Sequence, residues 1–563
     1  MNLKLLFRVG VLLSCFGGNS WTFAQNIGDF VSLQAGAQDQ QLHLPATHTF
    51  QVLIQKNDAF SDGNTMPDLP DFTAYMPING SSRVGHLCVN EERYFGGVHV
   101  LELSYDSLQR VWTHFNSEKM DMSLFCGARR NCSGGITPWL TVLSCEESYD
   151  TGDCNADGYQ DFGWVIEVNP YTRELMDYDT DGLPDKLWRM GRFKHENAAC
   201  NANGRSVYLG ADDSSFGFVY KYVADSVGNL SSGNLFVLKQ ITSNTAEWVQ
   251  LPNTTPQECN EVQSNAVALG ASNYNGVEDV EIGPDGKIYF ASKGFGKVFR
   301  FDDTDILSGG APINNFETFV GGQSYLVNYG GAQMNVSWGL GNDNLAFDEA
   351  GNLWVLQDGG NNYIWVVGAD HTQANPKVKI FARTPAGCEP TGITFSPDFQ
   401  FLFMSIMHPS AANTMLQTDA ADQSIIFNRD ATIIIARKEN LGCNDADNDG
   451  LCIWEDTDND NDGLADVSDN CPYTPNSWQF DTNGNGQGDA CDCFDAYVLA
   501  ATDTLFANQA EFFSAKDSIT AYSQVQAQAT LSLDAATAIT LKEGFVAEQA
   551  SDVRVFIEGC AVP

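Results

Sequence analysis

The sequence predicts an all-β protein whose largest part is a β-propeller. From residue 84 to residue 438 the chain repeats one unit, a polar turn followed by a short strand of β-branched, aromatic and other apolar residues. Residues 203–209, 284–290 and 350–355 are examples. Helical periodicity is almost absent, so strands must pack on strands. The units recur at long and irregular intervals, which favours a propeller with loop insertions over a two-sheet sandwich.

Residues 1–24 have the pattern of an export signal. Lys4 and Arg8 precede an apolar run from Val9 to Phe16, and residues 22–24 resemble a cleavage site. The run is too short to span a bilayer, and no other segment offers eighteen uninterrupted apolar residues. We therefore expect an exported protein that is secreted, periplasmic or at the cell surface, with no membrane-spanning segment.

The predicted propeller occupies residues 25–442. Residues 25–80 are weakly patterned and are expected to form an outer strand pair or the closure of the ring. The formal net charge of −42 excludes ordinary nucleic-acid binding, because a polyanion would be repelled. Cations are the expected partners of so acidic a chain.

Acid is most concentrated in residues 443–493, where Asp-Asn-Gly repeats replace the strands. Residues 443–495 hold 14 of the 72 acidic residues and no Lys or Arg. Carboxylates at alternate positions followed by a glycine are how a loop presents oxygens to Ca²⁺. The alternative is an acidic solvated linker. The expected calcium ligands are Asp445, Asp447, Asp449, Asp458, Asp460, Asp462, Asp466, Asp469, Asp481, Asn483, Asn485 and Asp489.

With cysteines interleaved between the acidic loops, this segment resembles thrombospondin type 3 repeats. In that family the chain wraps around calcium ions instead of a hydrophobic core. The resemblance implies a disulfide between Cys471 and Cys491, which spacing alone does not establish. Residues 494–563 return to short alternating strands and resemble the small β modules at the ends of bacterial surface and secreted proteins. We expect a structural or attachment role for them, with attachment to the cell surface as one possibility.

Two more acidic loops flank a strand at residues 164–168 inside the predicted propeller. They are interpreted as structural calcium sites at a blade edge, with plain Asp-Gly hairpin turns as the alternative. Their expected ligands are Asp153, Asn155, Asp157 and Asp161 in the first loop and Asp177, Asp179, Asp181 and Asp185 in the second.

The segments that carry chemistry lie between residues 138 and 409. A thiolate and several carboxylates on separate turns can bind a cluster of hard cations around a softer metal such as iron. The segments are 144–147 (Ser-Cys-Glu-Glu), 191–196 (Gly-Arg-Phe-Lys-His-Glu), 208–213, 275–280, 343–348, 387–392 and 406–409. In this order they resemble the PhoX family of secreted alkaline phosphatases.

The resemblance implies a six-bladed propeller with an iron and calcium cluster on its axis, which hydrolyses phosphate esters. It makes Cys145 the iron-bridging thiolate, and Glu146, Glu278 and Glu389 carboxylates of the cluster. The alternative, a purely structural one, is that Cys145 forms half of a disulfide. The family tends to carry a basic residue just before the last glutamate, whereas residues 386–388 of this chain are Ala-Gly-Cys.

Three further residues are candidates in these motifs. Glu196 could ligate calcium and Arg192 could bind a phosphate oxygen through its planar fork, although a buried Arg–Glu pair that closes a blade would fit equally well. Asp213 follows a strand and could be a ligand or part of a turn. His408 is more often a satisfied core residue at such a position.

The sequence therefore predicts an exported, metal-dependent phosphatase that hydrolyses phosphate monoesters with iron and calcium as cofactors. The alternative is a propeller without turnover that serves as a calcium-dependent adhesion or ligand-binding module. The missing basic residue before Glu389 and the two added domains, the acidic segment and the C-terminal module, favour the alternative. Retention of Cys145, Glu146, Glu278 and Glu389 together favours the enzyme.

Overall fold

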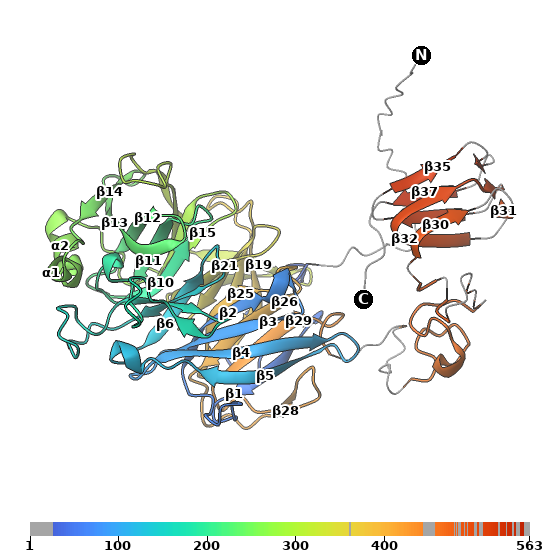
Figure 1. Ribbon diagram of the computed structural model, residues 1–563, viewed down its shortest axis with the longest axis horizontal. Coiled ribbons are helices and arrows are strands. Elements are labelled where there is room, and N and C mark those ends of the chain that lie inside the picture. Colours follow the sequence, from blue (N-terminus) through green and yellow to red (C-terminus); the bar gives the residue numbers. More distant parts are fainter. Residues whose placement is uncertain are drawn as a thin grey trace, which may run out of the picture.

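The computed structural model confirms the all-β class and contains a six-bladed propeller (Figure 1). It describes residues 26–359 and 362–442, residue 447, residues 456–477, 479, 481, 486–488 and 490–492. In the C-terminal part it describes residues 494–499, 504–505, 510–526, 530–535, 538–542, 545–547 and 552–556. Within these residues no helix is both long and apolar enough to cross a membrane.

Each blade is an antiparallel sheet whose strands follow one another from the axis outwards. From the innermost strand, the first blade contains β2 (Pro70–Pro77), β3 (Val84–Glu91), β4 (Gly97–Asp106) and β5 (Val111–Lys119), and the second β6 (Asn131–Ile136), β7 (Val142–Glu146), β8 (Val165–Asn169) and β9 (Glu174–Leu175). The third contains β10 (His195–Cys200), β11 (Ser206–Ala211), β12 (Val219–Ser226), β13 (Asn229–Gln240) and β14 (Ala246–Leu251).

The remaining three blades follow the same order. The fourth contains β15 (Val277–Ile282), β16 (Ile288–Ser292), β17 (Lys297–Asp302) and β18 (Asn314–Gly321), and the fifth β21 (Asn342–Phe347), β22 (Leu353–Gln357), β23 (Tyr363–Val367) and β24 (Val378–Arg383). The sixth contains β25 (Glu389–Phe395), β26 (Phe401–Met407), β29 (Ala431–Arg437) and β1 (His48–Gln55).

Short elements lie between these strands and in the acidic segment. They are the hairpins β19 (Ser324–Tyr329) with β20 (Ala332–Ser337) and β27 (Gln417–Thr418) with β28 (Ser424–Ile425), the helices α1 (Pro256–Asn260) and α2 (Val262–Leu269), and the 3₁₀ turns Ile78–Gly80, Ser123–Phe125, Trp188–Met190 and Asp466–Ser468. The capping box of Thr255 and Glu258 fixes the start of α1.

The N-terminal strand closes the ring. β1 is the outermost strand of the sixth blade and pairs antiparallel with β29, from His48 opposite Arg437 to Gln55 opposite Ala431. This is the ring closure that was one of two expectations for residues 25–80. The same stretch also holds β2, which is the innermost strand of the first blade and part of the wall of the axis.

Six apolar clusters hold the blades together, one between each pair of neighbours. Between the sixth and first blades, the rings of Tyr75 and Phe403 stack with centroids 4.8 Å apart. Between the fifth and sixth, Trp354 and Phe395 meet edge to face at 5.4 Å. Full burial of one large apolar side chain contributes about 1.5–3 kcal/mol, so these layers stabilise the ring independently of any ion.

The innermost strands share an irregularity that matters for the axis. In the first five blades the pairing of the inner strand with the second strand skips two residues near its start. The first skipped residues are Asp71, Cys132, Glu196, Glu278 and Asp343, and the second are Phe72, Ser133, Asn197, Asp279 and Asn344. Such bulges change which way side chains face and are over-represented beside functional sites.

Three of the second skipped residues link four successive inner strands, β10, β15, β21 and β25. Asn197 Oδ1 accepts a hydrogen bond from the Val280 amide at 2.9 Å, and Asp279 Oδ2 accepts one from the Leu345 amide at 2.7 Å. Asn344 Oδ1 accepts one from the Gly392 amide at 2.6 Å. We call these three contacts the inter-blade clasps. They satisfy backbone donors that the bulges leave without a partner in the ladder.

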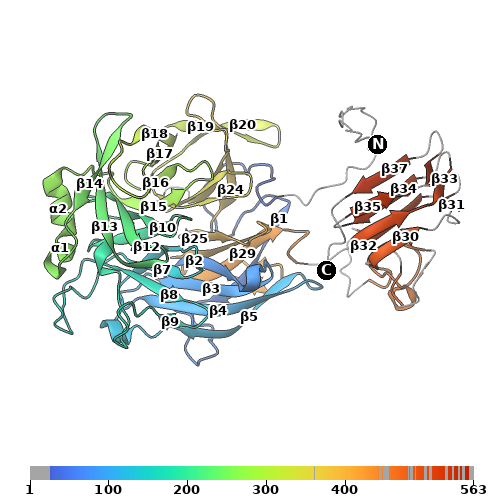
Figure 2. The ribbon, with the colours of Figure 1, turned by 45° about the horizontal axis from the view of Figure 1, so that its top comes forward.

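The C-terminal part consists of parallel sheets (Figure 2). One sheet contains β30 (Phe494–Leu499), β32 (Ala510–Ala521), β34 (Thr530–Ala535) and β37 (Asp552–Phe556), with β35 (Ala538–Leu541) paired to β32; the other contains β31 (Thr504–Leu505), β33 (Gln524–Val525) and β36 (Val546–Ala547). Ala510 pairs with Thr530 and Thr530 with Asp552, so the chain coils with a step of 20 to 22 residues. The predicted β module is therefore a short parallel solenoid around buried residues such as Ile519 and Leu533.

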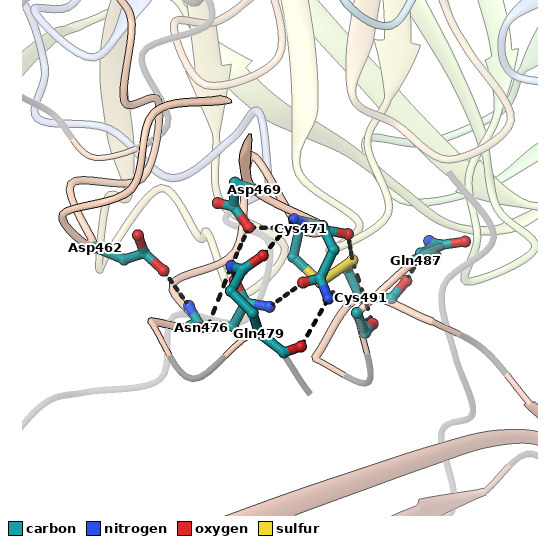
Figure 3. The surroundings of a disulfide bond; sticks show 9 residues. Asp462, Asp469, Cys471, Asn476, Gln479, Gln487 and Cys491 are labelled. Atoms are coloured by element: carbon teal, nitrogen blue, oxygen red, sulfur yellow. Dashed lines mark hydrogen bonds between the residues drawn. A yellow bond between two sulfur atoms is a disulfide. The ribbon is translucent and has the colours of Figure 1, made fainter. Parts of the chain in front are cut away.

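The acidic segment is held by a covalent link and polar contacts (Figure 3). A disulfide joins Cys471 to Cys491, as the sequence resemblance implied. Asp469 Oδ1 accepts the Cys471 amide at 2.8 Å, and Asp462 Oδ2 accepts the Asn476 amide at 2.8 Å. One oxygen on each of Asp458, Asp460 and Asp469 is buried without a hydrogen-bond partner.

The clasps give a testable consequence for the fold. Replacement of Asn197 by Ala should lower the free energy of unfolding by roughly 2–4 kcal/mol, because the Val280 amide and the Gly134 carbonyl would be left buried without partners. Urea unfolding followed by tryptophan fluorescence measures this. Asn244→Ala, at an exposed turn, is the control and should change stability by less than about 0.5 kcal/mol. Equal effects of the two variants would contradict the role of the clasps.

Candidate metal centre

The six inner strands meet around the propeller axis and each brings one metal-binding side chain to it. Every neighbouring pair of these strands is in contact, including β2 with β25, so the ring is closed (Figure 1). The side chains are Asp71 on β2, Cys132 on β6, Glu196 on β10, Glu278 on β15, Asp343 on β21 and Glu389 on β25. We call these residues the axial cluster. All but Glu389 are 6% exposed or less, and the side chain of Glu389 is 14% exposed.

The donor atoms of the axial cluster form overlapping groups. Ligand atoms of Asp71, Cys132 and Glu196 all lie within 4.8 Å of one another, and the same holds for Glu196, Glu278 and Asp343. Cys132 also belongs to a group with Glu92 and Glu147 at the rim. Because Cys132 and Glu196 are each shared between two groups, the arrangement suits several neighbouring ions better than one.

Burial and mutual repulsion favour protonation of the cluster in the absence of a cation. Burial and the nearby Asp71 raise the pKa of Cys132, whose thiol donates to Asp71 Oδ2 at 3.2 Å. Burial and the charge of Glu278 raise the pKa of Glu196 well above its usual range. Burial also raises the pKa of Asp71 to about 7. A set of anions this close is stable only if protons or cations neutralise it.

Within the described part of the chain, a lysine side chain reaches into the cluster. Lys293 Nζ lies 2.9 Å from Glu278 Oε1 and 3.3 Å from Asp358 Oδ2. The charge of Glu278, followed by those of other carboxylates, raises the pKa of Lys293 above its usual value. A single ammonium group cannot balance five carboxylates, so the cluster retains a strong affinity for cations.

The residues fit a mixed metal cluster. Asp71 Oδ1 is buried and accepts no hydrogen bond, which leaves lone pairs available to an ion. Carboxylate oxygens suit calcium and one thiolate suits a softer metal such as iron. Protons must leave the acids and the thiol when metal binds.

Comparisons with known proteins agree with this geometry. Residues 110–410 match the family model of alkaline phosphatase PhoX, and residues 444–479 match that of the thrombospondin type 3 repeat. The first match spans more than half of the chain. The chain belongs to the PhoX family. No curated protein sequence matches it.

Solved structures share the propeller. PhoX from Pseudomonas fluorescens, in complex with vanadate, a transition state analogue, superposes with a TM-score of 0.57 at 21% identity, over 73% of this chain and 98% of that one. Two gluconolactonases are more distant. The one from Xanthomonas campestris has 10% identity and a TM-score of 0.35 over 72% of this chain and 97% of its own, and the one from Pseudomonas aeruginosa has 12% and 0.33 over 71% and 98%.

The sequence-predicted residues of the Cys-Glu-Glu motif lie away from the axial cluster of this PhoX propeller. Cys145 is on β7, the second strand of its blade, and is buried in the apolar cluster between the second and third blades with Leu143 and Val165. Glu146 is buried and forms an ion pair with Lys186 at 2.9 Å. It also accepts backbone amides of Arg129 and Gly163. Both residues have structural surroundings.

The Arg192 and Asp213 candidates also have structural partners. The Arg192 guanidinium donates to the carbonyls of Phe162 and Asp150 at 2.8 and 2.6 Å and stacks on Tyr149. Asp213 accepts the amides of Ser215 and Phe216, as in a turn. In contrast, Glu196, Glu278 and Glu389 belong to the axial cluster as expected from the motifs. His408 is at its rim, with Nε2 3.8 Å from Glu389 Oε2.

Sequence reasoning missed Asp71, Cys132, Asp343 and Lys293. Asp71 lies outside residues 110–410, which match the PhoX family model, and Cys132 precedes the motifs recognised in the sequence between residues 138 and 409. Their position in the strands is a signal that could have identified three of these residues. Asp71, Cys132 and Asp343, like Glu278, each directly follow the first residue of an inner strand. That position is recognisable only once the inner strands are known.

The structure places the two calcium-loop candidates of the propeller as follows. Carboxylate oxygens of Asp177, Asp179 and Asp185 lie within 4.8 Å of one another. In the other loop Asp161 Oδ1 accepts the Cys154 amide, and a disulfide links Cys154 to Cys126. In the acidic segment, Asp460 is largely buried and its pKa is raised by burial. Asp445, Asp449, Asn483, Asn485 and Asp489 lie outside the described residues.

The rim carboxyls predict a pH dependence in protein without metal. Burial, followed by nearby carboxylates, raises the pKa of Glu92 and of Glu147 from 4.5 to about 7. Between these values the folded chain holds more protons than the unfolded chain, so stability should fall as the pH rises from about 4.5 to above 7. The loss is on the order of 3 kcal/mol for each group.

Unfolding in urea with EDTA, repeated between pH 5 and pH 8.5, measures this slope. Replacement of Glu92 and Glu147 together by Gln should flatten it, while Glu349→Gln at an exposed position should leave it unchanged. A metal-free protein that becomes more stable over this range would contradict the assignment.

Proposed function

We propose that this chain is an exported phosphatase that hydrolyses phosphate monoesters at an iron and calcium cluster held by the axial residues. The convergence of one thiol and five carboxylates on the axis of a PhoX propeller supports the proposal most directly. The export pattern of residues 1–24 supports the location, and so do disulfides in the described part of the chain.

The residues divide into two kinds of ligand. Cys132 would hold the softer metal, iron, because it is the thiol that contacts both Asp71 and the rim glutamates. Asp71, Glu196, Glu278, Asp343 and Glu389 would hold calcium and share charge with iron. Bound cations of this kind would act as Lewis acids on the phosphoryl oxygens and lower the pKa of an attacking water.

Lys293 would orient the substrate. Its side chain is 37% exposed at the mouth of the cluster, and in the absence of ions it pairs with Glu278 and Asp358. When cations neutralise those carboxylates, the ammonium group is free to donate to a phosphate oxygen. This would compensate for the absence of a basic residue directly before Glu389. The rim carboxylates would repel an unneutralised anion, so binding of phosphate should require the cations.

The two cysteines of the β6–β7 pair provide a decisive comparison. Cys132→Ser should remove bound iron and lower phosphomonoesterase activity by more than about 100-fold, since even loss of an outer-shell partner costs 10- to 100-fold. Cys145→Ser, which changes a buried apolar contact, should retain iron and most activity.

The measurements are metal analysis and hydrolysis of p-nitrophenyl phosphate at alkaline pH, on protein loaded with iron and calcium. If Cys145→Ser loses iron and activity while Cys132→Ser retains them, Cys145 and not Cys132 is the thiolate that holds iron. Wild-type protein that binds both metals without turnover would favour the non-catalytic calcium-dependent module instead.

Lys293→Met should raise KM for p-nitrophenyl phosphate by about 10- to 100-fold, because a charge-assisted hydrogen bond contributes roughly 1.5–3 kcal/mol. Its metal content should not fall, since the variant removes a cation that competes with the ions. Lys377→Met, at an exposed position, is the control. An unchanged KM would show that Lys293 does not contact the phosphate.

A further inference from the structure

A second acidic site lies on the same axis beyond the axial cluster. A cavity of about 580 Å³ is lined by later residues of all six inner strands, among them Phe72, Ser133, Asp279, Glu281 and Asn344. Because the inner strands run in the same direction around the axis, these residues form a layer next to the axial cluster and separate from it. Much of the cavity wall is apolar, with Phe347 and Phe395 among its members.

Charge in this cavity is entirely negative among the described residues. Asp279 and Glu281 line it, and no Lys, Arg or His does. The two acids are alternate residues of β15, so their side chains project from the same face of the strand. Neither forms an ion pair with a basic side chain among the described contacts. A pocket with two acids and no base is complementary to a cation.

The clasps show what is unusual about Asp279. Asn197 and Asn344 occupy the same position in the neighbouring blades and use both ends of the amide. Their oxygens accept an amide of the next inner strand, while their nitrogens donate to the Gly134 carbonyl and to Ser133 Oγ, both at 3.3 Å. Asp279 keeps the first contact through Oδ2. Its Oδ1 stands where an asparagine would place a donor, and a carboxylate has none to offer.

Asp279 Oδ1 is therefore an orphaned acceptor. The residue is 4% exposed, and Oδ1 is buried without a hydrogen-bond partner. Leaving such an atom unpaired costs about 1–3 kcal/mol, and more when it is charged. An asparagine would serve the clasp alone, as it does in two other blades. A carboxylate at this position calls for a ligand that an amide would not need.

We propose that Asp279 and Glu281 hold a hard divalent cation, Ca²⁺, in the axial cavity, independently of the axial cluster. Two carboxylates balance its charge, and strand carbonyls, Ser133 Oγ and water supply further oxygen ligands. A donor set made only of oxygen favours calcium over iron or zinc. The ion would tie the fourth blade to the centre of the ring, so its contribution is to the stability of the propeller.

Calcium analysis after equilibrium dialysis tests the site on the full-length protein. Asp279→Asn and Glu281→Gln should each reduce bound calcium by one ion per chain, and the double variant should also lose only one, because one ion is shared. Asp225→Asn, at an exposed position, is the control and should lose none. Iron is measured in the same samples and should not change, which separates this site from the proposed active centre.

Unfolding experiments add a stability readout that does not depend on phosphatase activity. Asp279→Asn retains the clasp to Leu345, so it should fold and be at least as stable as wild type in EDTA. The rise in melting temperature that calcium produces should be smaller in this variant than in wild type. Crystals soaked with Tb³⁺ should give an anomalous peak between Asp279 and Glu281.

Three results would overturn the proposal. Calcium content of Asp279→Asn equal to that of wild type would mean that a proton or a water satisfies Oδ1. An anomalous map without a peak at the cavity would mean the same. Loss of iron together with calcium in both variants would mean that the substitutions disturb the axial cluster and do not define a second site.

Discussion

Concentration of like charge on the propeller axis is the constraint on which the rest of the structure depends. Five carboxyls and a thiol lie almost without solvent between six strands, with Lys293 as the basic group among them. Such a group of anions cannot stabilise the fold by itself. The free energy that keeps it in place comes from the apolar layers between the blades and from the closure of the ring by β1. The axial cluster keeps its geometry because the blades around it are stable without its help.

The bulges explain how one strand serves two layers of the axis. Regular pairing would turn successive side chains to opposite faces, so only every second residue could reach the axial cluster. The two skipped residues allow Glu278 to join the cluster while its neighbour Asp279 contacts the fifth blade. Glu196 and Asn197 have the same relation in the third blade. One local irregularity, repeated around the ring, thus positions the residues of the axial cluster and links adjacent blades.

The sequence contained enough to predict the all-β class and the propeller, because turn and strand signals depend on neighbouring residues. The number of blades required the resemblance to PhoX, since loop insertions hide the repeat. The candidate site was predicted in part. Glu196, Glu278 and Glu389 lie in motifs that run across the start of an inner strand, whereas Asp71 comes from a segment of weak pattern. The strand that carries Asp71, β2, contacts β25, and these contacts join residues more than 300 positions apart. No local signal in the sequence encodes them.

The choice between Cys132 and Cys145 shows the same limit at the scale of one hairpin. Both cysteines lie in short strands of similar composition, and the Cys-Glu-Glu motif gives the second more acidic neighbours. Which strand lines the axis is decided by the position of β6 next to β2 and β10, so the relevant information is tertiary. The acids beside Cys145 have other roles. Glu146 pairs with Lys186, and Glu147 reaches the rim of the cluster that Cys132 centres.

The cysteines of the described residues are of two kinds, disulfides in loops and thiols in the propeller. In the described residues the two disulfides, Cys126–Cys154 and Cys471–Cys491, each tie down an acidic loop. Inside the propeller Cys132 and Cys145 remain thiols, buried in the ring. Burial and nearby carboxylates raise the pKa of Cys132, so the thiol stays protonated and resists oxidation until a metal replaces its proton. A thiol protected in this way would remain available to a metal in a chain that also forms disulfides, because the same acids that would attract the metal keep the thiol protonated.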